Sequence, residues 1–141
     1  VRAKAFDAEY CCAGKDAVKR KIREIENNKD ATAVEQNLLT TLEVAYEYYI
    51  RGFEFLPISI YDSHATKFII KDGRLLPPFV AISGLGENAA WDLMRGREGK
   101  TFLSVEEVAA ACPKVSKTHI QMLKEAGAFG DLPDTSQVSF F

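Results

Sequence analysis

The stretch Gly84-Leu85-Gly86 has the residue types and spacing of a phosphate-binding turn. Because a glycine has no Cβ, both glycines permit positive φ angles and let a second backbone approach closely. Leu85 is expected to point inward and anchor the turn. A helix-forming run begins at Glu87, and the first amides of such a helix lack an intrahelical acceptor and lie at the positive end of its dipole. The pattern predicts a helix-hairpin-helix element, with an ordinary glycine-rich turn as the alternative.

A second turn of this kind follows about thirty residues later, at Lys114-Val115-Ser116. It keeps the apolar centre and replaces both glycines. Ser104 and Glu107 form a capping box, which predicts a helix as far as about Ala111, and Ser116 is placed to cap the next helix. The unit helix, turn, helix therefore occurs twice.

Two such turns on one surface can contact phosphates of both strands across a minor groove, and amides and basic side chains read no sequence there. We therefore favour duplex DNA binding over a purely structural helical domain. The predicted DNA contacts are the two turns with the polar and basic residues beside them: Gly84, Leu85, Gly86, Asn88, Arg95, Arg97, Lys100, Lys114, Val115, Ser116, Lys117 and Thr118.

The overall composition restricts where DNA could bind. The 141 residues carry 18 Lys and Arg against 20 Asp and Glu, a net charge of −2, so a broadly basic coat is excluded and any DNA contact must be local. The three cysteines lack metal-ligand spacing and only two histidines are present, so we predict no metal site. Neither a membrane span nor a signal peptide is visible, and a cytoplasmic location is expected. The chain opens on Val1 and not on Met, which suggests a fragment of a larger protein.

Helices are predicted to dominate the first half. Residues 15–28 form an amphipathic helix with a basic face, which could lie along DNA but is better explained as a solvated face. Thr32 and Glu35 form a capping box before a long helix that ends at Gly52. Two stripes of that helix predict burial over a wide face: Leu38, Leu42, Ala45 and Tyr49, and beside them Leu39, Tyr46, Ile50 and Phe53.

Between the helical halves the sequence predicts β structure. Phe55 to Tyr61 alternates as an edge strand would, and Asp72-Gly73 between two short apolar runs predicts a hairpin with a type I′ turn. Pro77-Pro78 ends the hairpin and starts a short helix over 79–82. The predicted fold class is α+β, mostly α.

The C-terminal tail from Asp131 is expected to be mobile. It ends on Gln137, Val138, Ser139, Phe140 and Phe141, and two phenylalanines on such a tail are costly to leave in water. Docking in a partner's pocket is the favoured explanation. Folding back onto the same domain is the alternative.

Several of these stretches together resemble one family, the C-terminus of the PolC-type bacterial DNA polymerase III alpha chain. They cover nearly the whole chain: Leu38 to Ala45, Arg51 to Phe53, Ala65 to Phe68, Phe79 to Ala89, Phe102 to Ser104, Lys114 to Thr118, Gly130 to Pro133 and Gln137 to Phe141.

The resemblance implies three parts. Residues 1–76 would end the fingers region, 77–130 would form a tandem helix-hairpin-helix duplex-binding domain, and 131–141 would be a flexible tail that docks on the sliding clamp. Family members usually read Gln-Leu-Ser-Leu-Phe at the end, so Val138 and Phe140 depart from the pattern while Gln137 and Phe141 keep it.

The resemblance also implies where catalysis occurs. The family's catalytic carboxylates lie in the palm, where they bind two magnesium ions. None of them maps onto this chain, so no residue here is predicted to be catalytic and no cofactor is expected in this fragment. The implied partners are primer–template duplex, the sliding clamp and the rest of the polymerase chain. Two other functions stay open: a protein-interaction module whose hairpins bind no DNA, and a DNA-repair scaffold that uses the same hairpins.

Overall fold

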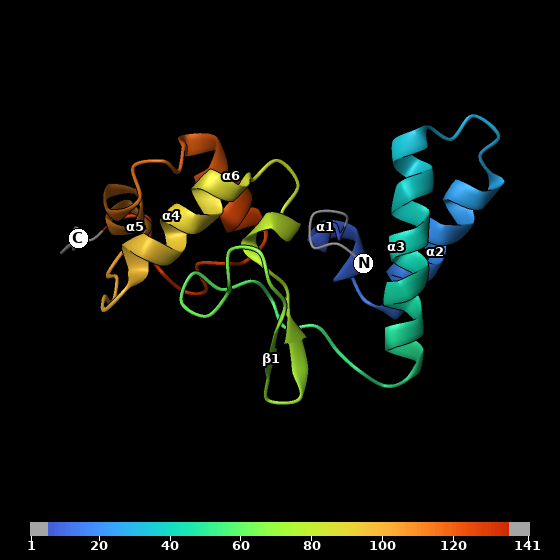
Figure 1. The fold of residues 1–141 in the computed structure, drawn as a ribbon, viewed down its shortest axis with the longest axis horizontal. Helices are drawn as coiled ribbons and strands as arrows, with labels where there is room; N and C mark the ends of the chain where they lie inside the picture. The colour runs from blue at the N-terminus through green and yellow to red at the C-terminus, as the bar shows by residue number, and fades with distance from the viewer. Residues whose placement is uncertain (1–5, 136–141) are drawn as a thin grey trace, which may run out of the picture.

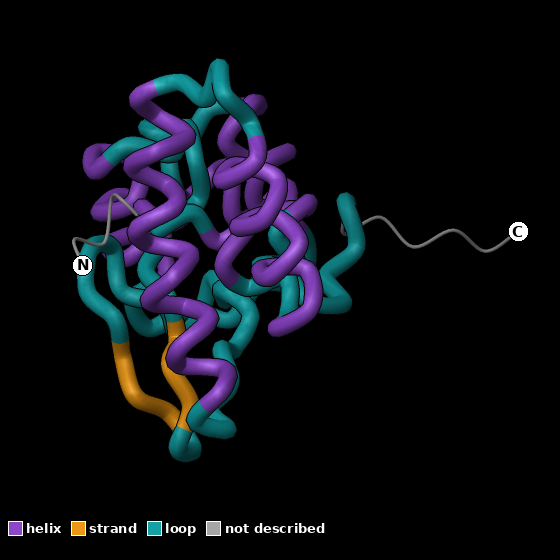
Figure 2. The backbone as a smooth tube through the Cα atoms, turned by 90° about the vertical axis from the view of Figure 1, so that its right-hand side faces the viewer, coloured by secondary structure: helices purple, strands orange, loops and turns teal. Residues whose placement is uncertain are grey.

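The computed structural model describes residues 6–135, which form a helical pair and a tandem-hairpin unit joined through short β structure (Figure 1). Asp7 caps the one-turn helix α1 (Ala8–Cys11), since its Oδ1 accepts from the amide of Glu9 at 3.0 Å. Helices α2 (Lys15–Asn27) and α3 (Ala33–Ile50) follow and run antiparallel (Figure 2). Both long helices were predicted from the sequence and are confirmed.

Apolar spacing and capping account for this pair. In α2, Val18, Ile22 and Ile25 are buried along one face. Helix α3 begins at the predicted capping box, where Thr32 Oγ1 accepts from the Glu35 amide at 3.1 Å and Glu35 Oε1 accepts from the Thr32 amide at 3.4 Å.

The predicted wide burial of α3 is wrong at its C-terminal end. Leu42 and Ala45 of the first stripe are buried, but Ile50 and Phe53 of the second stripe are 57% and 47% exposed. Helix α2 has 13 residues and α3 has 18, so the C-terminal end of α3 extends beyond its antiparallel partner.

The β-hairpin forms as predicted. Strands β1 (Ile69–Lys71) and β2 (Arg74–Leu76) pair antiparallel, with Lys71 opposite Arg74. Asp72 at φ 53° and Gly73 at φ 76° give the two positive angles that a type I′ turn requires.

The edge strand predicted over Phe55 to Tyr61 does not form. The structure has one parallel bridge, Phe55 to Leu75, in which the Leu56 amide donates to the Leu75 carbonyl at 2.8 Å. Pro57 has no N–H to continue such a ladder. The segment then turns to the hairpin unit instead, where the Ile60 amide donates to the Ala128 carbonyl at 3.0 Å.

The remaining elements form two similar units. The first consists of a 3-10 turn, η2 (Phe79–Ala81), and α4 (Glu87–Arg97), and the second of α5 (Val105–Ala111) and α6 (Lys117–Glu125). Their shared core includes Phe79, Leu93 and Leu123, each 2% exposed or less. The chain is thus mostly helical with a two-stranded hairpin, as the sequence predicts.

The start of the C-terminal tail is held against this unit. The carbonyls of Pro133 and Asp134 accept from the amides of Val105 and Glu106 at 2.9 and 3.1 Å, and the Asp134 carboxylate pairs with Lys124 at 2.7 Å. These contacts hold residues 133 and 134 against α5 and α6, and the mobility predicted for the tail stays a prediction. The predicted clamp-binding residues, Gln137 to Phe141, lie outside the described residues.

Candidate nucleic-acid interface

The two turns have matching backbones, 30 residues apart. In turn 1 (residues 82–86) the Leu85 amide donates to the Ile82 carbonyl at 3.1 Å, and in turn 2 (residues 112–116) the Val115 amide donates to the Cys112 carbonyl at 3.0 Å. The central side chains are buried, Leu85 at 3% and Val115 at 7% exposure. These two side chains anchor the turns to the core, so any DNA contact at Leu85 and Val115 would have to come from their backbone.

The helices that follow begin with the same geometry. Gly86 caps α4 at φ −77° and ψ 171°, and Ser116 caps α6 at φ −79° and ψ 170°. Each cap residue's carbonyl accepts the first helical hydrogen bond at 3.0 Å, from Ala90 and Ile120 respectively. The sequence-level repeat is therefore a structural repeat.

Both turns are exposed and lie along the same edge of the molecule in Figure 1, the upper one in that view. Gly84 in turn 1 and Lys114 in turn 2 are both exposed. Gly84 has φ +91°, an angle that suits glycine, whereas Lys114 does not have a positive φ. The backbone of turn 2 thus follows a path similar to that of turn 1 without a positive φ, so it does not require a glycine.

The amides of the two turns are used differently. Gly86 provides no side-chain cap, and within residues 6–135 the amides of Gly84, Gly86 and Asn88 have no hydrogen-bond acceptor. In turn 2 the Lys114 amide donates to Asp92 Oδ2 at 2.8 Å. The Ser116 amide donates to His119 Nδ1, and Ser116 Oγ accepts from the His119 amide, both at 3.2 Å. Within the described residues, turn 1 therefore leaves these backbone donors unpaired, whereas turn 2 largely satisfies its own.

A sequence profile described as the helix-hairpin-helix motif matches residues 52–137. The chain belongs to the helix-hairpin-helix family. The matched region begins well before residue 77, where we place the start of the hairpin domain, and the boundary at 76/77 stays a prediction. Contacts from Ile60 and Ser63 to the hairpin unit agree with an earlier start.

This helix-hairpin-helix chain is also homologous over its full length to PolC-type chains. It is 44% identical to "DNA polymerase III PolC-type" of Streptococcus agalactiae, 43% to that of Caldanaerobacter subterraneus and 40% to that of Thermotoga maritima. In each case the match covers 100% of this chain and 10% of the relative. The chain thus spans about a tenth of the length of these relatives.

The predicted basic contacts of the helix-hairpin-helix unit fall into two groups. Lys100, Lys114 and Lys117 are exposed, and none of them has an ion-pair partner among the described residues. The guanidinium of Arg95 instead binds the buried Asp92, and that of Arg97 donates to the carbonyls of Ile60 and Ser63. The three lysines thus have no competing ion pair within residues 6–135, whereas the guanidiniums of Arg95 and Arg97 hydrogen-bond within the fold; DNA contact by any of them stays a prediction.

Sequence reasoning missed Asp92. It is only 4% exposed and joins α4 to turn 2, but its partner lies 22 residues away, so the sequence shows no pairing. The available signal was an acidic residue between two apolar ones, Trp91 and Leu93, with Arg95 three residues later on the same helix face.

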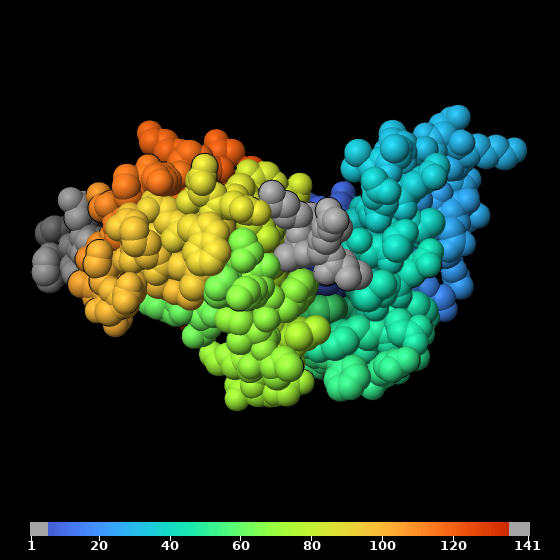
Figure 3. Space-filling view, in the orientation of Figure 1, coloured from blue at the N-terminus to red at the C-terminus, as the bar shows by residue number. Residues whose placement is uncertain are grey.

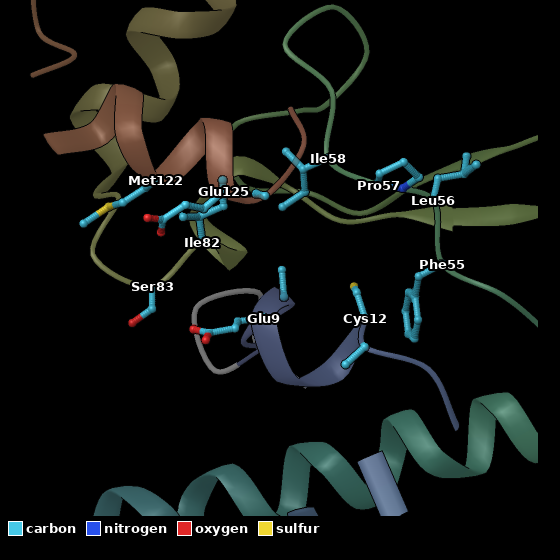
Figure 4. A pocket seen from close by; sticks show the side chains of 13 residues that line it. Glu9, Cys12, Phe55, Leu56, Pro57, Ile58, Ile82, Ser83, Met122 and Glu125 are labelled. Atoms are coloured by element: carbon cyan, nitrogen blue, oxygen red, sulfur yellow. The ribbon is translucent and has the colours of Figure 1, made fainter. Parts of the chain in front are cut away.

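A cavity of about 470 Å³ lies beside turn 1, between the two halves of the molecule. Figure 4 shows Cys12 of α1 and Phe55 on one side of it and Met122 of α6 with Ser83 on the other. The space-filling view shows the lobe that contains α3 on one side of the molecule and the hairpin unit on the other, with the β-hairpin region below and between them (Figure 3). The cavity therefore separates turn 1 and α6 from α1 and the segment 55–58.

Metal-binding clusters are absent from the described part of the chain, where no three His, Cys, Asp or Glu side chains gather. Cys11, Cys12 and Cys112 are free thiols, with Cys11 and Cys112 buried. No helix over residues 6–135 is long and apolar enough to cross a membrane.

Proposed function

We propose that this chain is the duplex-gripping and clamp-tethering part of a PolC-type replicative DNA polymerase. The observation that carries the proposal is the pair of matched, exposed turns with three lysines on or near them, Lys100, Lys114 and Lys117, which form no ion pair within residues 6–135. A turn with open amides and a turn flanked by lysines suit the same ligand, a sugar–phosphate backbone, and neither contact depends on base sequence.

The local charge at turn 2 supports duplex binding despite the net negative charge of the chain. The six Lys and Arg within 15–29 lie remote from the turns and do not contribute, but the buried Asp92 beside turn 2 is paired with Arg95 at 2.6 Å. Phosphates approaching turn 2 therefore meet Lys114 and Lys117 without a bare carboxylate at Asp92.

Nucleotidyl transfer would belong to other parts of the parent chain. Carboxylates in the palm would hold two magnesium ions that supply Lewis-acid chemistry there, and this chain's residues would hold the product duplex. Weak phosphate contacts allow sliding, and a tether from Gln137 to Phe141 to the clamp would raise the local concentration of polymerase at the primer end.

Salt-dependent binding tests the grip. We expect Lys114→Ala/Lys117→Ala to weaken binding of a labelled duplex and to lower the slope of log K against log salt by about 0.9 for each lost phosphate contact. The control Lys19→Ala/Arg23→Ala removes the same charge from α2 and should leave the slope unchanged. Equal slopes for both double variants and the parent would remove turn 2 from the interface.

Clamp tethering needs its own test. Truncation after Ser136 should abolish binding to the sliding clamp and leave duplex affinity unchanged. A chain that bound clamp but no duplex at low salt would instead favour a protein-interaction module. Duplex binding with no clamp affinity would favour a repair-type scaffold.

A further inference from the structure

The helices that follow the two turns make reciprocal contacts across the unit. Position 92 of α4 and position 122 of α6 are equivalent, because they are 30 residues apart like the turns themselves. Asp92 Oδ2 accepts from the amide of Lys114 in turn 2 at 2.8 Å. Met122 packs on Gly84 in turn 1, with its Cε only 2.8 Å from the place a Cβ on Gly84 would occupy. Each helix thus contacts the turn of the other unit.

The Asp92 contact is polar and fully used. Oδ1 accepts from Arg95 Nε at 3.0 Å and from Nη2 at 2.6 Å, while Oδ2 takes the Lys114 amide. Arg95 Nη2 also donates to the Ala111 carbonyl at 3.2 Å, just before turn 2. The buried carboxylate and its arginine therefore hold turn 2 at Lys114 and just before its first residue.

The Met122 contact is the apolar counterpart. Gly84 lacks a side chain and has φ +91°, which leaves room for the thioether against the backbone of turn 1. Methionine fills irregular gaps of this kind because its side chain is unbranched and flexible. Turn 1 is thus held by packing where turn 2 is held by a hydrogen bond.

We infer that Asp92 and Met122 are positioning residues that hold the two turns in one frame, so that both engage the same duplex. The inference rests on the proposed function. Two linked sites bind more tightly than either alone because the second contact is intramolecular, and that advantage requires a fixed separation that matches the phosphates. Loosening either cross-contact would leave both turns intact but no longer in register.

Asp92→Asn separates positioning from charge. The substitution removes one negative charge, which by itself strengthens DNA binding. Loss of register predicts the opposite, a roughly tenfold weaker affinity for a duplex long enough to meet both turns, with little change for a duplex that reaches only one. The control Asp62→Asn makes the same charge change at the exposed pair with Lys71, remote from both turns. It should bind as well as the parent or better.

A second variant covers the other turn and guards against unfolding. Met122→Ala should show the same selective loss for the longer duplex, and Met122→Leu, which keeps the packing volume, should restore most of it. Amide hydrogen exchange is measured on both variants. We expect faster exchange at Lys114 in Asp92→Asn with Leu93 and Leu123 still protected.

The possible outcomes distinguish failure of the positioning inference from failure of the proposed duplex binding. A parent chain that binds no duplex ends the proposed function. A parent that binds, with Asp92→Asn and Met122→Ala folded and equally tight on the longer duplex, overturns the cross-contact inference alone. If Asp92→Asn loses core protection, the comparison of Met122→Ala with Met122→Leu decides.

Discussion

Arg97 at the end of α4 donates from Nη1 to the carbonyl of Ile60 at 3.0 Å, 37 residues earlier in the chain. The same nitrogen donates to the Ser63 carbonyl, and the guanidinium lies 5.7 Å from the centre of the Phe79 ring. One side chain therefore fastens loop 60–63 to the hairpin unit. That loop in turn reaches the end of the unit through the Ile60–Ala128 hydrogen bond.

Arg97→Ala should destabilise the fold and leave the salt slope of duplex binding unchanged. Two partly buried carbonyls would lose a charged donor, a loss of about 2–3 kcal/mol in the free energy of unfolding. Urea titration measures the loss, and duplex titration at several salt concentrations measures the slope. Lys100→Ala is the control and should show the reverse, a lower slope with stability within about 0.5 kcal/mol of the parent. A reduced slope for Arg97→Ala would return Arg97 to the predicted interface.

Alanine at the two glycines of turn 1 should affect different properties. At Gly84 the positive φ and the nearby Met122 make alanine strained, at about 1–3 kcal/mol of stability. At Gly86, φ is −77° and a Cβ would meet no atom within 4 Å, so the fold should tolerate alanine. The added methyl stands where a phosphate would approach the open amides, so Gly86→Ala should weaken duplex binding. Calorimetry and fluorescence anisotropy report the two quantities; full duplex affinity in Gly86→Ala would exclude close approach at turn 1.

Low pH should weaken the hydrogen bond that holds turn 2 to Asp92. Burial raises the pKa of Asp92, but the hydrogen bonds from Arg95 and from the Lys114 amide outweigh it, and the pKa lies below its usual value. A carboxyl whose pKa is lower in the folded state adds stability that is present above the unfolded pKa of about 3.9 and is lost as pH falls through the folded value. We therefore expect the Lys114 amide to exchange faster relative to core amides below about pH 4. Asp92→Asn should remove this pH dependence, and an unchanged profile would assign it to another carboxyl.

The two neighbouring cysteines should be unreactive in the native protein. Burial, with smaller effects from nearby acidic groups, raises the pKa of Cys11 and of Cys12 to about 12, so both thiols are protonated at neutral pH. Thiolate is the reactive form, and alkylation by iodoacetamide at pH 8 should be slow until denaturant is added. Mass spectrometry of peptides that contain both residues measures it. Rapid native labelling at Cys12, which lines the cavity beside turn 1, would show that the cavity opens readily.

Local signals predicted the elements whose cause is local. The capping box at Thr32 and Glu35, the Asp72-Gly73 turn and the repeat of turns 1 and 2 depend on neighbours a few residues apart, and each was found from the sequence. The failures involve distant partners. Phe55 to Tyr61 alternates like a strand, but its hydrogen bonds go to Leu75 and Ala128.

The same distinction holds at the site. Exposure of the turns followed from their residue types. Arg95 and Arg97 hydrogen-bond to carbonyls, and Asp92 to an amide, in segments 16–37 residues away. No spacing pattern in the sequence indicates these contacts. A basic residue near a hairpin can as easily fasten the fold as meet a ligand. Only the packing around it decides which.

The hydrogen bonds of Pro133 and Asp134 to the start of α5 limit how far from α5 a partner bound to Gln137 could lie. Two residues, Thr135 and Ser136, separate Asp134 from Gln137, and a fully extended chain covers about 10 Å over these three steps. A sliding clamp bound at Gln137 would therefore lie close to α5, and this short connection would restrict the orientation of the clamp relative to the hairpin unit.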